Sequence, residues 1–244
     1  HNYWLKEKKI DAVYEKKKIN ENEIKNFISE IREKKFDGAN VTIPFKQKII
    51  SFLDELTHEA KITQSVNTIY RKNNKIIGHN TDISGFELGI KETKYNINNK
   101  TILILGAGGV VPSIICALEK MKASRIIVSN RTKIKAENLK KLFKGLLVGD
   151  WGHVPDFDMI INATSLGLKK EDKIELDFSK TQSNKFFYDV IYKPDETYFL
   201  KMGKELKCKT ENGKKMFVFQ ASAAFKVWHN IEPNIDNEIY KILD

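Results

Sequence analysis

The sequence predicts an α/β protein of two domains, because two different patterns of apolar residues follow one another along its 244 residues. Before Asp82, short strands that end in polar residues are mixed with amphipathic helical stretches. Beyond Asp82, strands that are apolar throughout alternate with helices, which is typical of a parallel sheet covered by helices. A chain of this length can hold two domains that each bury a core.

The part before Asp82 reads as helices packed on a small sheet. Residues 21–36 place apolar side chains at helical spacing, so we expect an amphipathic helix there. Residues 39–42 form a short predicted strand, and 44–56 form a predicted helix with a proline near its first turn. Residues 66–80 predict a hairpin, because a pair of asparagines at the centre of the segment suits a tight turn.

The part beyond Asp82 alternates strands with helices, and such βαβ units build a parallel sheet. The predicted strands are 101–106, 125–130, 158–164 and 186–192, with predicted helices over 111–121 and 135–143. From residue 217 the pattern becomes helical, with predicted helices over 217–231 and 237–243. Terminal helices of this kind can fold back on the first domain.

The net charge of +10 does not by itself indicate a nucleic-acid partner. Lysines are spread along most segments, usually beside glutamate or aspartate and not interleaved with aromatic residues, so they read as solvated helix faces. The same charge suits an anionic substrate or cofactor. The sequence contains no run of about 18 apolar residues and no secretory signal, so we expect a cytoplasmic protein without a membrane segment.

The two cysteines, Cys116 and Cys208, lie far apart in the sequence. Neither belongs to a CxxC pattern or stands near a pair of histidines, so we expect no metal site. Reduced, buried thiols are the interpretation that fits their apolar and mixed surroundings.

A glycine loop, LILGAGGVVPS, follows the strand over 101–106 and opens the next helix. Glycines in this position allow a tight turn and let a pyrophosphate approach the backbone at the helix N-terminus. Gly106 and Gly108 fill the first two positions of GxGxxG, Ala107 lies between them, Gly109 adds flexibility, and Val111 takes the third position. A tight turn without a ligand is the alternative, but the strand before and the helix after favour dinucleotide binding.

The end of the next strand, SNRTKIK, favours NADP over NAD. An NAD site usually has Asp or Glu there to bind the ribose 2′-hydroxyl, and this segment has no acid. Arg131 can pair with a 2′-phosphate, Lys135 adds charge one helical turn later, and Thr132 offers a hydroxyl beside Asn130. A helix N-cap with nearby surface cations would explain Thr132, but it leaves the missing acid unexplained.

Polar residues also gather at strand ends in the first part of the chain. Asn40, Thr42, Asn67 and Asp82 offer amides, a hydroxyl and a carboxylate that can hold a polyhydroxylated small molecule. Lys46 and Asp82 would supply a proton donor and the carboxylate that orients it. In the second part, NATSLG over 162–167 follows a buried strand, where ligands bind in open α/β sheets, although a plain loop explains that segment equally well.

In combination these segments resemble the shikimate dehydrogenase family, also described as shikimate/quinate dehydrogenases. The matching pieces, in the family's order, are NVTIPFK, VNT, NTDxxG, GAGG, NRT, NATSLG, DVIYKP and GKKMFVFQA. The resemblance implies an N-terminal α/β substrate-binding domain over 1–82, completed by C-terminal helices over 217–244. It also implies an inserted Rossmann-type parallel-sheet NADP-binding domain over 83–216. The implied activity is reversible NADPH-dependent reduction of 3-dehydroshikimate to shikimate, on the route to chorismate and aromatic amino acids.

The resemblance also implies a role for each matching residue. Lys46 and Asp82 are the expected catalytic pair. The expected substrate contacts are Asn40, Thr42, Asn67, Tyr192 and Gln220. The expected cofactor contacts are Gly106, Ala107, Gly108, Gly109, Asn130, Arg131, Thr132, Lys135, Thr164, Ser165, Val190, Gly213 and Met216. No metal is expected, and the partner is a small-molecule substrate bound by a monomer or homodimer.

Three positions depart from the family's pattern. The sequence starts at His1 and Asn2, which close the family's SxSxxxHN motif for the substrate carboxylate. If the protein lacks the two serines, we expect poor substrate affinity, and if they precede His1, the motif is intact. Val111 and Pro112 follow the glycine loop where small residues are usual, and Lys215 stands where the family often has glycine. A quinate/shikimate dehydrogenase or a related paralogue is an alternative, because discrimination between the two substrates rests on a few polar contacts. A non-catalytic NADP-binding regulatory protein is a more remote one, and the presence of both Lys46 and Asp82 argues against it.

Overall fold

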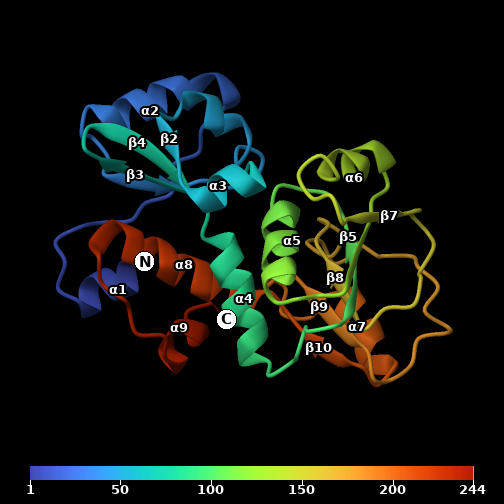
Figure 1. Cartoon of the computed structure of the whole chain (residues 1–244). Helices are drawn as coiled ribbons and strands as arrows, with labels where there is room; N and C mark the ends of the chain where they lie inside the picture. The colour runs from blue at the N-terminus through green and yellow to red at the C-terminus, as the bar shows by residue number, and fades with distance from the viewer. Residues whose placement is uncertain (244) are drawn as a thin grey trace. The chain divides into compact units, whose positions relative to one another are not determined.

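The computed structural model describes residues 1–243, and these form two compact units (Figure 1). Unit 1 consists of His1–Gly85 and the chain from Val218 onward, and unit 2 consists of Phe86–Phe217. The chain passes from one unit to the other within helix α4 (Asp82–Glu92) and returns within helix α8 (Lys214–His229). Each unit therefore has its own sheet and its own core.

In the described part of unit 1, four strands form a sheet in the order β1-β3-β4-β2. Strands β3 (Thr68–Lys72) and β4 (Lys75–His79) form the predicted hairpin, which is confirmed. Asn73 and Asn74 have φ values of 50° and 61°, the left-handed conformation that a two-residue hairpin turn of type I′ requires. The edge strands are β1 (Gly38–Asn40), antiparallel to β3, and β2 (Glu55–Leu56), parallel to β4.

The predicted helix over 21–36 is present but shorter. It consists of a 3₁₀ turn at Glu21–Glu23 and helix α2 (Ile24–Arg32), whose buried residues Ile24, Ile28 and Ile31 face the sheet core. Lys34 adopts φ 68°, a left-handed conformation that ends the helix before the predicted boundary. Helical spacing therefore predicted the face of this helix correctly and its end incorrectly.

The predicted helix over 44–56 is wrong. Turns occupy this segment up to a 3₁₀ helix, η2 (Lys48–Phe52), and the segment then joins the sheet as β2. The Lys46 carbonyl accepts a hydrogen bond from the Val66 amide (2.8 Å), so it cannot continue an α-helical ladder, and the Ile50 amide turns instead to Gln47. Lys46 consequently lies on a turn that is fixed to the residues preceding β3.

The remaining helices of unit 1 come from both ends of the described chain. These are α1 (Asn2–Glu7), α3 (His58–Thr63), most of α8, and α9 (Asn237–Lys241). Trp4, Phe225 and Ile239 are buried together, which packs α1, α8 and α9 into one apolar cluster. Trp228 of α8 donates from Nε1 to the Ile69 carbonyl of β3 (3.0 Å), which fixes α8 to the sheet.

In the described residues of unit 2, six parallel strands form a sheet in the order β10-β9-β8-β5-β6-β7, which confirms the predicted parallel sheet. Their bounds are β5 (Thr101–Leu105), β6 (Arg125–Ser129), β7 (Leu147–Gly149), β8 (Met159–Asn162), β9 (Phe186–Asp189) and β10 (Lys209–Glu211). The sequence did not predict the two edge strands β7 and β10. They are three residues long, and Lys-Thr-Glu in β10 lacks the apolar pattern of a central strand.

The register of this sheet aligns the carboxyl ends of its central strands. Leu105 lies opposite both Ser129 and Asn162, and Asn162 lies opposite Asp189. Helices α5 (Val111–Lys120), α6 (Lys133–Leu139) and α7 (Tyr198–Glu205) pack on the sheet, and α5 runs beside β5 in Figure 1. The loops that follow four neighbouring strands therefore begin at one edge, where ligands bind in folds of this kind.

Both cysteines are buried, as predicted, and they form no disulfide within the described chain. None of the helices described over 1–243 is long and apolar enough to cross a membrane.

Candidate active site

Lys46 and Asp82 form a buried ion pair in unit 1. Lys46 Nζ lies 2.5 Å from Asp82 Oδ2, and the two side chains are 14% and 5% exposed. Asp82 is the first residue of α4, and its amide donates to Asn80 Oδ1 (3.0 Å), which fixes the start of the helix. A lysine and a carboxylate held this close, with a small part of the lysine open to solvent, can hold and transfer a proton.

The Asn67 side chain connects this pair to the loop before α4. Its Nδ2 donates to Asp82 Oδ1 and to Thr81 Oγ1, both at 2.9 Å. Its Oδ1 accepts from the Thr81 amide (2.8 Å) and from the Thr68 hydroxyl (3.0 Å). Because a backbone amide can only donate, these bonds fix which way the Asn67 amide points. One Asp82 oxygen therefore faces Asn67 and the other faces Lys46.

Two further predicted substrate residues join the same cluster. Gln220 of α8 lies with its Oε1 3.3 Å from Asn67 Nδ2, and Asn40 Nδ2 donates to the Asn67 carbonyl (3.1 Å). Thr42 lies two residues after the end of β1 and is exposed. The structure thus brings Asn40, Asn67 and Gln220 into contact around the ion pair.

Residues that the sequence reading did not assign complete this cluster. The Tyr14 hydroxyl donates to Asn40 Oδ1 (2.9 Å), and burial raises the pKa of Tyr14, which keeps the hydroxyl protonated as a donor. Nothing in the lysine-rich segment around Tyr14 signals this contact. Thr68 and Thr81, by contrast, stand within the VNT and NTD motifs, and their position there could have signalled a role.

The glycine loop of unit 2 contains two glycines that differ in what surrounds them. Gly106 has φ +107°, and a Cβ at this position would lie 2.8 Å from the Ala163 carbonyl oxygen, so the backbone itself requires glycine. A Cβ at Gly108 would meet nothing within 4 Å, and Gly108 is exposed. The space beside Gly108 is open to a ligand, next to the start of α5.

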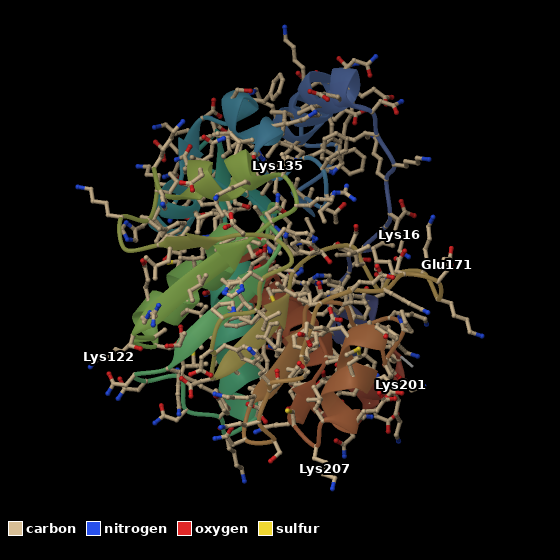
Figure 2. All side chains as sticks on the ribbon, turned by 90° about the vertical axis from the view of Figure 1, so that its right-hand side faces the viewer. Lys16, Lys122, Lys135, Glu171, Lys201 and Lys207 are labelled. Carbon is tan, nitrogen blue, oxygen red and sulfur yellow. The ribbon has the colours of Figure 1, made fainter. Side chains whose placement is uncertain are left out.

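The segment after β6 contains three cationic side chains, Arg131, Lys133 and Lys135. Asn130 Nδ2 donates to the Thr132 carbonyl (2.8 Å), and Thr132 precedes α6 without a capping hydrogen bond from its side chain. Within residues 1–243, Arg131 and Lys135 are exposed and make no ion pair, and Figure 2 marks Lys135 on α6. Lys133 instead pairs with Asp150 (2.6 Å). Arg131 and Lys135 are therefore available to an anion.

The other predicted cofactor residues lie on the loops that follow β8 and β9 and at the start of α8. The Thr164 hydroxyl donates to Asn162 Oδ1 (2.7 Å), whereas Ser165 is exposed. A Cβ on Gly213 would lie 2.1 Å from the Val190 carbonyl oxygen, so these two segments are in close backbone contact. Met216 is buried in unit 2.

Tyr192 belongs to unit 2, whereas the other predicted substrate residues belong to unit 1. Its ring stacks on Phe217 with the centroids 4.3 Å apart, and burial raises the pKa of its hydroxyl. Over the described residues, no group of three or more His, Cys, Asp or Glu side chains is arranged to hold a metal ion.

Comparison with known proteins decides the family. The family model described as "Shikimate dehydrogenase substrate binding domain" matches residues 1–69, and the model described as "Shikimate / quinate 5-dehydrogenase" matches residues 87–191. A shikimate dehydrogenase (NADP(+)) from Pelagibacter ubique is 55% identical over 244 residues, which is all of this chain and 92% of the relative. The chain belongs to the shikimate dehydrogenase family.

Solved structures of this family share the fold. A crystal structure of shikimate dehydrogenase in complex with NADP+ is 34% identical, with a TM-score of 0.92 over 100% of this chain and 88% of the other. The Thermus thermophilus shikimate 5-dehydrogenase in complex with NADP(H) and shikimate is 27% identical, with a TM-score of 0.89 over 100% of this chain and 91% of the other. The two-unit α/β architecture is thus that of known shikimate dehydrogenases.

Proposed function

We propose that the chain is an NADP-dependent shikimate dehydrogenase that reduces 3-dehydroshikimate to shikimate reversibly. This reaction belongs to the pathway to chorismate and the aromatic amino acids. The observation that carries the proposal is the buried Lys46–Asp82 pair, ordered by Asn67, in a chain related over its whole length to a shikimate dehydrogenase (NADP(+)). As the sequence leads us to expect, the proposal includes a cytoplasmic location and a monomer or homodimer.

Lys46 is the proposed proton donor and Asp82 its orienting partner. NADPH, when bound, supplies the hydride that reduces the ketone carbon. Negative charge then grows on the ketone oxygen, and the Lys46 ammonium stabilises it and gives up a proton. In the reverse direction, neutral Lys46 removes the proton of the hydroxyl group. The short contact with Asp82 and the bond from Asn67 to the other carboxylate oxygen hold the ammonium in one place.

The substrate contacts follow from the polar groups around this pair. Asn40, Thr42, Asn67 and Gln220 offer amide and hydroxyl groups to the hydroxyls and carboxylate of a ring substrate. Tyr192 is the proposed contact from unit 2. Hydrogen bonds among Tyr14, Asn40 and Asn67 orient these amides before the substrate arrives, which lowers the entropic cost of binding.

The residues of unit 2 fit an NADP molecule. Gly106, Ala107, Gly108 and Gly109 would receive the pyrophosphate, because the loop is open at Gly108 and precedes a helix. Arg131 and Lys135 would pair with the 2′-phosphate, with Asn130 and Thr132 beside them. The proposed contacts for the nicotinamide half are Thr164, Ser165, Val190, Gly213 and Met216.

The test follows the appearance of reduced cofactor with four pairs of reactants, shikimate or quinate with NADP or NAD. We expect turnover with shikimate and NADP. Turnover with quinate and NAD would favour a quinate dehydrogenase. The description of the matching family model names quinate beside shikimate. NADP binding without turnover on either substrate would favour a non-catalytic, regulatory role.

A further inference from the structure

Asp189 carries a carboxylate that the proposed mechanism does not use. It is the last residue of β9, it is 0% exposed, and within the described chain no cationic side chain pairs with it. Burial raises its pKa to about 6, against the lowering effect of its hydrogen bonds. Burying an acid without a countercharge costs free energy, so the presence of an acid at this position requires a physical reason.

Among the described residues, every hydrogen bond to this carboxylate comes from a neutral donor. Oδ2 accepts from the Thr197 hydroxyl (2.7 Å), and Oδ1 accepts from the Ile191 amide (2.9 Å). Asn162 Nδ2 lies 3.1 Å from both oxygens. A carboxylate can accept all of these bonds, whereas an asparagine has one acceptor oxygen and would turn an NH₂ group toward donors.

Through Asn162 the carboxylate reaches the loop over 162–167. Asn162 Oδ1 accepts from the Thr164 amide (3.1 Å) and hydroxyl (2.7 Å), and Asn162 Nδ2 also donates to the Leu166 carbonyl (3.0 Å). The Thr164 hydroxyl in turn accepts from the Leu166 amide (3.0 Å). The conformation of this loop therefore depends on which way the Asn162 amide points, and Asp189 sets that direction.

Through Ile191 the carboxylate reaches the segment that contacts Gly213. The Ile191 amide donates to Asp189, and the Ile191 carbonyl accepts from the Gly213 amide (3.1 Å). The Val190 amide donates to the Asn162 carbonyl (3.0 Å), which ties the two loops together directly. One buried acid thus connects three segments that hold predicted cofactor residues.

We propose that Asp189 is a positioning residue for the nicotinamide-nucleotide site, which sets the loops over 162–167 and 189–197 in the arrangement that the cofactor needs. The inference rests on the proposed function, because that function assigns these loops to NADP. Asp189 itself is fully buried, so it acts through Asn162, Thr197 and Ile191 and not by contact with the cofactor.

Thr197 offers the sharpest test, because it is 2% exposed and lies outside the predicted cofactor residues. Its hydroxyl donates to Asp189 and accepts from the Leu200 amide (3.3 Å) at the start of α7. Thr197→Val removes the hydroxyl and keeps the shape, whereas Thr197→Ser keeps the hydroxyl. Asp189→Asn replaces the acid by its amide. Glu171→Gln is the control, because it makes the same change from acid to amide at an exposed residue on a surface loop (Figure 2).

The experiment measures the dissociation constant of NADP by calorimetry and the KM values for NADP and shikimate, below the melting temperature of each variant. We expect Thr197→Val and Asp189→Asn to weaken NADP binding about tenfold, with the KM for shikimate little changed. Thr197→Ser should restore most of the affinity, and Glu171→Gln should bind as the wild type does.

Unchanged NADP affinity in Thr197→Val, with only a lower melting temperature, would overturn the inference and leave Asp189 a purely structural residue. The proposed function would survive that result. A wild-type protein that binds no NADP would overturn the proposed function, and this inference with it.

Discussion

At the scale of single residues, Arg131 differs from the neighbouring cation Lys133 in that it makes no ion pair within residues 1–243. Lys133 pairs with Asp150, while the exposed Arg131 has no ion pair within the described residues. We predict that Arg131→Ala weakens NADP binding about 10- to 100-fold and leaves NAD binding nearly unchanged, because only NADP carries a 2′-phosphate. Calorimetric titration with both cofactors measures this.

Lys133→Ala is the matched control, since it removes a cation two residues away, at the start of α6, that is already neutralised by an acid. The assignment of Arg131 to the 2′-phosphate would be wrong if the two variants lost affinity for NADP equally, or if Arg131→Ala lost NAD affinity to the same extent.

The raised pKa of Asp189 predicts that the stability of the folded protein depends on pH. Its pKa rises to about 6 in the folded protein from an ordinary value of 3.8, so the folded state holds the proton more tightly than the unfolded chain. The resulting stabilisation is fully present below pH 3.8 and is lost as the pH rises through 6. A shift of this size corresponds to roughly 3 kcal/mol.

Urea denaturation of wild type and Asp189→Asn between pH 4 and pH 7 measures this effect, since the asparagine does not titrate. We expect the stability of the wild type, relative to the variant, to fall across that range. A difference that stays constant with pH would contradict the raised pKa, and Glu171→Gln serves as the control for an exposed acid.

At the scale of elements, two glycines of the glycine loop are expected to have different roles, Gly106 in folding and Gly108 in NADP binding. Gly106→Ala should destabilise the protein by ~1–3 kcal/mol, because alanine strains the left-handed backbone and meets the Ala163 carbonyl. Gly108→Ala should leave the melting temperature unchanged, since its Cβ would enter open space, yet weaken NADP binding about tenfold or more where the pyrophosphate approaches. Thermal melts and NADP titrations of both variants check this.

If Gly108→Ala binds NADP as tightly as the wild type does, the pyrophosphate does not approach the backbone at Gly108. A variant that instead fails to fold would show that the space beside Gly108 is needed by the protein itself.

Some of the helices and strands could be predicted from the pattern of residues within each segment, and others could not. The hairpin and the central parallel strands follow from an asparagine pair and from apolar runs, signals that lie within the segments themselves. The failure over 44–56 has a different origin, because the bond from Val66 to the Lys46 carbonyl depends on a residue twenty positions away. Periodicity within a window contains no information on such a bond.

The residues of the candidate site also fall into two groups, those that the sequence predicts and those that only the fold reveals. Lys46, Asp82 and Asn67 stand in motifs that the sequence shows directly, and the structure places them in contact. Tyr14 and Thr197 act through side-chain hydrogen bonds to Asn40, twenty-six residues away, and to Asp189, eight residues away, and neither lies in a segment whose composition signals a site. Such residues become visible only when the fold brings their partners together.

At the scale of the whole molecule, the proposed function divides the work between the two units. Unit 1 contains Lys46 and Asp82, and unit 2 contains the glycine loop and Arg131. Removal of a proton-transfer group from one unit should therefore leave cofactor binding by the other intact. Proton transfer by unit 1 and cofactor binding by unit 2 can therefore be measured separately.

The measurement that tests this division of work most directly is kcat for shikimate oxidation by NADP, together with the NADP dissociation constant, in Lys46→Ala. We predict a loss in kcat of about 10²- to 10⁴-fold with NADP binding unchanged. Lys48→Ala, which removes an exposed lysine paired with Glu21, should retain wild-type kcat. Wild-type turnover in Lys46→Ala would contradict the assignment of proton transfer to Lys46.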